Sequence, residues 1–106
     1  MTDDEMNVLR AGVQEWGGPA SLTEPVARAI GFTSVQDFFI HSQRIQACLR
    51  GGESMSFAEW RRTLLATELV FVSDVIGSGT DWETTTGIRD AEALRLLRSL
   101  QRKIVP

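Results

Sequence analysis

Residues 56–76 read SFAEWRRTLLATELVFVSDVI, and this stretch decides the fold of the 106-residue chain. Ser56 with Glu59 three residues later is a capping box, which is typical of a helix start. The glycine-rich tripeptide at residues 77–79 is a helix-breaking signal. We therefore expect one unbroken central helix over residues 57–76, against which all other segments fold.

The apolar side chains of this helix form two stripes about 110° apart, at about 100° of rotation per residue. The first contains Phe57, Trp60, Leu64, Phe71 and Val75, and the second contains Ala58, Leu65, Leu69, Val72 and Ile76. An apolar arc this wide predicts that the helix contacts neighbours on two sides. Residues 69–72 also resemble a short strand in composition, but the stripe that continues through them favours a helix.

Similar start and stop signals predict the other helices. The first helix follows a capping box of Thr2 and Glu5, and the second runs from Glu24 to Ile30 and ends before Gly31. The third runs from a cap at Thr33 or Ser34 to about Arg50, and the last begins near Arg89 or Asp90. Residues 77–88 show no periodicity and are predicted to be a loop. The sequence thus predicts an all-α, compact single domain over residues 1–106, a bundle of about five helices around the central helix.

The composition limits the classes of partner. Eleven basic and fourteen acidic residues give a net charge of −3, which makes nucleic acid and anionic lipid poor partners. The single cysteine excludes an internal disulfide and any multi-cysteine metal site. The chain starts with acidic residues where a secretory signal would be basic, and it has no apolar run of membrane-span length. We expect a cytoplasmic protein without a cofactor.

One predicted helix carries a polar face that resembles a site. Asp37, His41, Arg44 and Cys48 recur at helical spacing. An aspartate can orient the imidazole one turn later, and an arginine can favour a nearby thiolate. His41 and Cys48, however, are separated by about 10 Å of helix rise, too far for a catalytic dyad. One histidine and one aspartate also leave a zinc site short of ligands, so a solvated polar face is the main interpretation.

Two charged residues of the central helix, Arg61 and Glu68, fall between its two apolar stripes. We expect this polar seam to be semi-buried, and buried charges require partners. Seven residues are too many for a direct bridge between the two side chains. The partners are therefore expected on other helices, or at a mouth where the seam opens to solvent, and a polar pocket is the functional alternative.

Two features suggest an interaction surface. Trp82 stands between Asp81 and Glu83 in the predicted loop, and an exposed tryptophan is a typical anchor for a partner protein. A lone loop tryptophan can instead plug the open end of a bundle. The last predicted helix carries an arginine-rich face suited to an acidic partner or to self-association. That face consists of Arg95, Arg98 and Arg102.

Residues 26–34, VARAIGFTS, followed by Phe38, resemble the helix-turn-helix core of AraC-type transcription regulators. A small residue is followed four positions later by glycine, then by phenylalanine, a polar cap and a further phenylalanine. The resemblance implies that residues 34–50 form a recognition helix. Its outward face would present Gln36, Asp37, His41, Gln43 and Arg44. This face offers only one fixed positive charge to phosphates, which departs from what DNA binding needs.

These observations favour a non-enzymatic interaction or regulatory module that binds another protein or a second copy of itself. The first alternative is a helix-turn-helix DNA-binding regulator. The second is a small ligand-binding bundle or small enzyme that uses the Arg61 and Glu68 seam or the Asp37 and His41 face.

Overall fold

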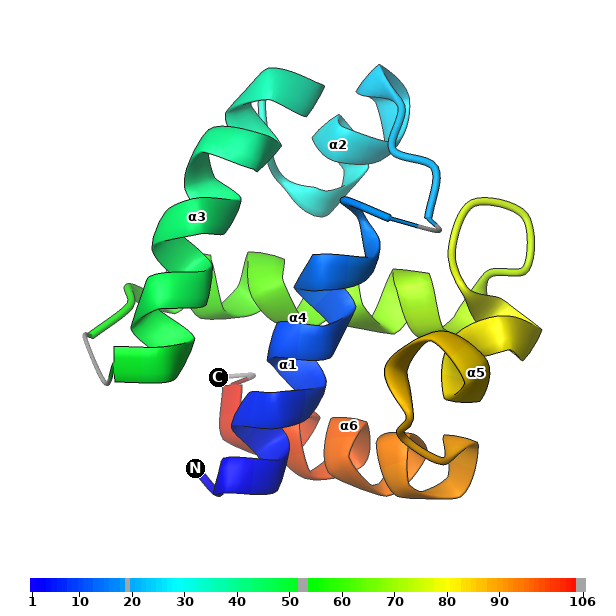
Figure 1. Ribbon diagram of the computed structural model, residues 1–106. Helices are drawn as coiled ribbons and strands as arrows, with labels where there is room; N and C mark the ends of the chain where they lie inside the picture. Colours follow the sequence, from blue (N-terminus) through cyan, green and yellow to red (C-terminus); the bar gives the residue numbers. More distant parts are fainter. Residues whose placement is uncertain (19, 52–53, 105–106) are drawn as a thin grey trace.

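The fold is all-α, as predicted. The computed structural model describes residues 1–18, 20–51 and 54–104, and the described residues form six α-helices and one short 3₁₀ helix, with no strand among them (Figure 1). The helices are α1 (Asp3–Glu15), α2 (Glu24–Ile30), α3 (Val35–Gly51), α4 (Phe57–Val72), η1 (Gly79–Asp81), α5 (Trp82–Thr86) and α6 (Asp90–Ile104). The radius of gyration, 12.5 Å, is that of a compact single domain of this length. None of the described helices is both long and apolar enough to cross a bilayer.

The predicted capping signals all form. In α1 the Thr2 hydroxyl accepts the Glu5 N–H, and the Glu5 carboxylate accepts the Thr2 N–H. Ser56 and Glu59 make the same reciprocal pair at the start of α4. Gly31 ends α2 with φ +119°, a left-handed conformation that a side chain would disfavour. The boundaries of α2 therefore agree with the prediction.

The central helix α4 is shorter than predicted and ends at Val72, four residues before Ile76. The Ser73 hydroxyl accepts the Ile76 N–H, which is an alternative to helical hydrogen bonding. The chain then turns back along α4, and the Ser78 N–H donates to the Val70 carbonyl at 2.7 Å. The apolar pattern gave no sign of this helix end, because the hydrogen bond back to Val70 comes from Ser78, which lies beyond the pattern.

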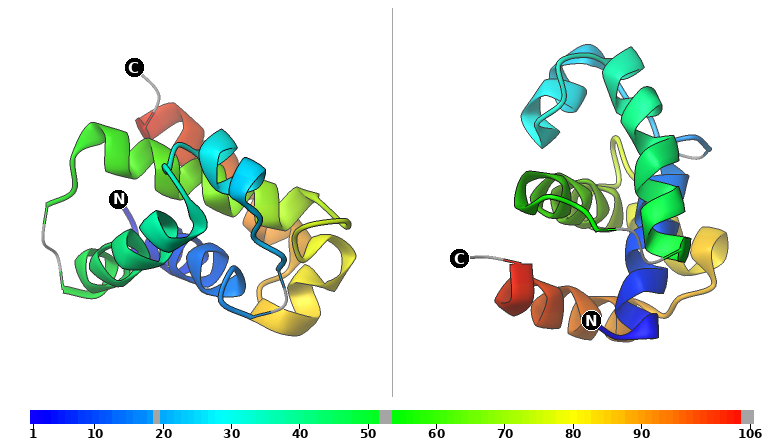
Figure 2. Two further views of the ribbon diagram at one scale, coloured as in Figure 1. Left: turned by 90° about the horizontal axis from the view of Figure 1, so that it is seen from above. Right: turned by 90° about the vertical axis from the view of Figure 1, so that its left-hand side faces the viewer.

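The remaining helices surround α4 on three sides. In the right-hand view of Figure 2, α1 and α3 lie on one side of α4, and α2 and α6 lie above and below it. The Trp16 indole N–H donates to the Ala66 carbonyl at 3.1 Å and fixes the end of α1 against α4. The fourth side of α4 is not covered by any helix of the described chain.

The central helix contacts neighbours on more than one side, as its wide apolar arc predicted, but part of that arc is left uncovered (Figure 2). The face of α4 that is buried consists largely of small or polar residues, namely Glu59, Thr63, Leu64, Ala66, Thr67 and Val70. Leu64 belongs to the first stripe, and Trp60 and Phe71 of that stripe pack partly against the core. In the second stripe, Leu69 and Ile76 likewise pack partly against the core. The exposed members of the two stripes are Phe57 and Val75 of the first and Ala58, Leu65 and Val72 of the second.

Residues 77–88 are not the irregular loop that was predicted. They contain η1 and α5, and Gly87 caps the C-terminal end of α5. Trp82 begins α5 and is fully buried, with its ring edge-to-face against Phe71 at a centroid distance of 5.3 Å. The segment therefore folds as part of the core, and the missing periodicity reflects how short its helices are.

Candidate functional site

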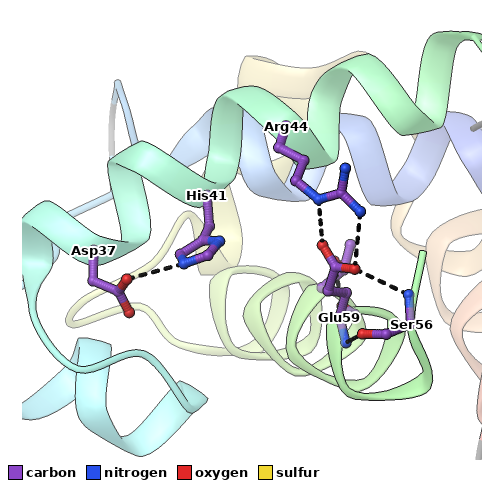
Figure 3. Close-up of polar contacts among 6 residues, drawn as sticks. Asp37, His41, Arg44, Ser56 and Glu59 are labelled. Carbon is purple, nitrogen blue, oxygen red and sulfur yellow. Dashed lines mark hydrogen bonds and ion pairs between the residues drawn. The ribbon is translucent and has the colours of Figure 1, made fainter. Parts of the chain in front are cut away.

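The polar face predicted on α3 separates into two local interactions (Figure 3). His41 Nε2 lies 3.0 Å from the Asp37 carboxylate, which also accepts the Thr33 N–H at 2.8 Å. The hydrogen bond from the Thr33 backbone is the largest factor that lowers the pKa of Asp37, and the charge of His41 adds to it. This pair closes the first turn of α3 next to its Ser34 cap.

Arg44 belongs to a different contact. Its Nε lies 2.9 Å from one Glu59 oxygen and its Nη2 lies 3.3 Å from the other, so the pair links α3 to the start of α4 (Figure 3). The hydrogen bond from Arg44 is the main cause that lowers the pKa of Glu59 to about 2. Cys48 is buried in the core. The four residues do not converge, and no three metal-ligating side chains come together in the described part of the chain.

The outward face of α3 agrees only in part with the face that the AraC resemblance implies. Gln36, Gln43 and Arg44 are exposed, whereas Asp37 and His41 are half-buried. Two apolar residues, Phe39 and Ile40, are also exposed. The helix–glycine–helix junction itself is present, since α2 ends at Gly31 and α3 begins at Val35.

The predicted Trp82 anchor is wrong, because the side chain is buried beneath α5. Its burial agrees with the alternative in which a lone tryptophan plugs the bundle. Asp81 and Glu83 beside it are exposed. Glu83 accepts the Asp90 N–H at 2.7 Å and so joins α5 to the start of α6. These three residues do not form an apolar docking surface.

Two exposed apolar residues of the central helix border a groove against α6. Leu65 and Val72 of α4 are 42% and 72% exposed, and Leu94 of α6 is 50% exposed. They border a groove of about 410 Å³ between the two helices, which we call the α4–α6 groove. Its lining is Leu65, Glu68, Leu69, Phe71, Val72, Leu94, Leu97, Arg98 and Gln101. The exposed apolar residues thus lie together in a concave surface rather than singly.

The polar seam lies at the end of this groove. Glu68 is half-buried and accepts the Gln101 amide at 2.5 Å, so its partner is on another helix, as predicted. Arg61 is exposed, contrary to the prediction, and its guanidinium carbon lies 5.9 Å from the centroid of the Phe57 ring. Both residues line a second pocket of about 380 Å³, and Leu65 and Glu68 line both hollows. The seam therefore opens to solvent as a mouth.

The three arginines predicted on the last helix differ in their surroundings. Arg98 lines the α4–α6 groove and donates to Gln101 at 3.2 Å. Arg95 forms an exposed ion pair with Glu92 one turn earlier, and Arg102 is exposed in the last turn. Of the three arginines, Arg98 is therefore the one that lines the groove.

Sequence reasoning missed Leu94 and treated Val72 as a core residue. The available signal was the apolar arc of α4, which is wider than contact with a single neighbouring helix would need.

The chain matches no protein-family model, no curated protein and no solved structure.

Proposed function

We propose that this protein is a non-enzymatic interaction module that binds an amphipathic, acidic helix of another protein in the α4–α6 groove. One observation carries the proposal: Leu65 and Val72 of the central helix are exposed and line the same groove as the exposed Leu94 of α6. Contiguous exposed apolar surface, as opposed to scattered single residues, marks interaction sites. A ligand that covered this surface would remove apolar area from water, which favours binding by roughly 25 cal/mol per Å².

The length of the groove suits a helical ligand. From Leu65 to Val72, the part of α4 that lines the groove rises by about 10 Å, which is the length of about two helical turns. A helix in such a groove presents anchors at positions i, i+3 or i+4, and i+7. The exposed Leu65 and Val72 are themselves seven residues apart, so they match the spacing of such anchors.

The charges around the groove favour an acidic flank on the ligand. Arg98 lines the groove, and Arg61 and Arg102 both stand toward one end of it, because the C-terminal end of α6 lies beside the start of α4 (Figure 1). The carboxylate of Glu68 is engaged by Gln101. Groove-to-groove pairing of two copies would bring these arginines together, which disfavours a homodimer through this surface. Leucine and valine side chains between the arginines likewise suit a protein better than a nucleic-acid backbone.

A designed peptide tests the proposal directly. We would label a helical peptide with leucines at i, i+3, i+7 and i+10 and glutamates on its flanks, and measure its binding by fluorescence anisotropy. We expect saturable binding that Val72→Asp and Leu94→Asp each weaken at least ~10-fold, equivalent to about 1.4 kcal/mol. The same peptide with lysines in place of glutamates should bind more weakly.

The matched control is Ile40→Asp, which places the same charge on an exposed apolar residue of α3. It should leave binding unchanged, and the melting temperatures of all three variants should stay close to that of the wild type because each side chain is largely exposed. Equal weakening by Ile40→Asp, or equal binding of the lysine peptide, would contradict the proposal. So would a concentration-dependent dimer that Val72→Asp abolishes, because the groove would then hold a second copy.

A further inference from the structure

A second pocket lies between α2, α4 and the end of α6, beside the α4–α6 groove. We call it the Arg62 pocket. It has a volume of about 380 Å³ and is lined by Ile30, Gly31, Ala58, Arg61, Arg62, Leu64, Leu65, Glu68 and Ile104. We propose that this pocket binds a small organic carboxylate with an apolar body, independently of the helix that occupies the groove.

Arg62 is the residue that points to an anion. Its guanidinium carbon lies 5.1 Å from the centroid of the Phe32 ring, and its stem passes over Gly31. A Cβ at Gly31 would lie 3.0 Å from the Arg62 Cγ and Cδ, so the absence of a side chain there makes room for the arginine. Stacking on an aromatic ring holds a guanidinium in place while leaving its in-plane N–H groups available.

The donors of Arg62 are not used within the described chain. Its Nε is buried without a hydrogen-bond partner, and no carboxylate among residues 1–18, 20–51 and 54–104 lies within ion-pair distance of its guanidinium. The charge of Arg62 reaches Asp37 only at longer range, and Asp37 is already bonded to Thr33 and His41. A fixed guanidinium without an acceptor suits a charge-assisted, two-point contact with an incoming carboxylate.

The rest of the lining defines the body of the ligand. Arg61 adds a second positive charge at the rim and, in that same part of the chain, also has no carboxylate within ion-pair distance. Aliphatic side chains from three helices, among them Ile30, Leu64 and Ile104, form much of the remaining wall. A ligand with an anionic head beside the arginines and an apolar chain along this wall would match both the charged and the apolar part of the lining. The volume of the pocket lies within the range of small-ligand sites.

Octanoate is a suitable probe, because it joins one carboxylate to an apolar chain. We expect saturable binding by NMR titration, with amide shifts centred on Gly31 and Arg61. Arg62→Met keeps the apolar stem and removes the charge, and should weaken binding at least ~10-fold. Arg62→Lys should weaken it less, and Arg10→Met on α1 should leave it unchanged. If Arg62→Met fails to fold, Arg61→Met replaces it as the test variant, because Arg61 is exposed. Arg61→Met should also weaken octanoate binding.

Several results would overturn the inference. Octanol that binds as tightly as octanoate would show apolar association only, and unchanged binding in both arginine variants would remove the proposed anion contact. Val72→Asp separates the two sites, since it should weaken binding of the acidic peptide but not of octanoate. Loss of octanoate in Val72→Asp, with binding retained in Arg62→Met, would place the probe in the groove.

Discussion

Gly12 of α1 lies against Thr67 of α4 where the two helices cross, and a Cβ at position 12 would be 2.5 Å from the Thr67 Cγ2. The crossing is close because the face of α4 turned toward α1 carries small side chains, among them Thr63 and Ala66. Thr67 thus lies on the side of α4 that is buried, whereas Leu65 and Val72 are exposed at the α4–α6 groove.

Gly12→Ala should destabilise the protein. The added methyl must displace the Thr67 side chain or part the two helices, and such overpacking costs about 1–3 kcal/mol. Chemical denaturation of the variant and the wild type would measure this change. Thr67→Ala removes the clashing atoms, so the double variant should be less destabilised than the sum of the two single variants.

The matched control for this prediction is Gly17→Ala, where the nearest atom to a new Cβ is the Gln14 carbonyl oxygen at 3.6 Å, an ordinary contact. Its effect on the free energy of unfolding should be small. Equal losses in Gly12→Ala and Gly17→Ala would mean that the crossing between α1 and α4 can relax.

Acid should destabilise the fold through Glu5. Burial raises the pKa of this carboxyl, but hydrogen bonds from Lys103, Ser99 and Thr2 outweigh burial and lower the pKa from about 4.5 to about 2. A folded-state pKa below the unfolded value stabilises the protein above pH 4.5, and this contribution is lost as the pH falls towards 2. The shift corresponds to roughly 3 kcal/mol at neutral pH. Urea midpoints measured between pH 7 and 2 would follow the loss.

Glu5→Gln should lower stability at pH 7 and make the acid dependence shallower. Asp4→Asn removes a carboxylate from an exposed position in the same turn, and it should leave the slope between pH 4.5 and 2 nearly unchanged. A Glu5→Gln variant with the acid slope of the wild type would contradict the assignment to Glu5.

Trp82→Ala should act on the fold and not on binding. The side chain is fully buried against Phe71, and truncating a buried tryptophan typically costs 3–5 kcal/mol. Thermal unfolding should therefore show a large drop in melting temperature, whereas Val72→Asp should cause little change. A Trp82→Ala variant with the melting temperature of the wild type would mean that this residue is not part of the core.

Local signals predicted where most helices begin, because a capping box acts within four residues of the chain. Thr2 with Glu5 and Ser56 with Glu59 both form as the sequence predicted. The end of α4 was misjudged because its stop depends on a return contact to the Val70 carbonyl. Helical starts can thus be read from neighbours in sequence, but this stop could not.

The angular position of the polar seam was also predictable, whereas its exposure was not. Helical geometry placed Arg61 and Glu68 between two apolar stripes, and both residues do line one pocket. Whether a neighbouring helix covers that arc depends on where α2 and α6 pack, since both border the pocket. Close helix contacts also depend on positions such as Gly12, whose contribution is the lack of a side chain and therefore gives no hydrophobic signal.

The segment after α4 is anchored to α1 by a buried carboxylate, and this contact yields a further prediction. Glu15 accepts the Ser78 hydroxyl at 2.5 Å and also the Thr85 hydroxyl. The two donors flank η1 and most of α5, so a single side chain ties both ends of this short stretch to the bundle. A charged acceptor strengthens such hydrogen bonds relative to a neutral one.

Glu15→Gln removes the charge and one acceptor oxygen with little change of shape. We expect a loss of about 1–3 kcal/mol in the free energy of unfolding, the usual range for a disturbed buried hydrogen bond. Hydrogen exchange should become faster mainly at the amides of residues 79–86, because the lost contacts hold that stretch and not the crossing of α1 with α4. Gln14→Ala, at the exposed neighbouring position, should leave those amides as protected as in the wild type. Faster exchange spread evenly over α1 and α4 would instead mean that Glu15 supports the whole core and that the segment has no separate anchor.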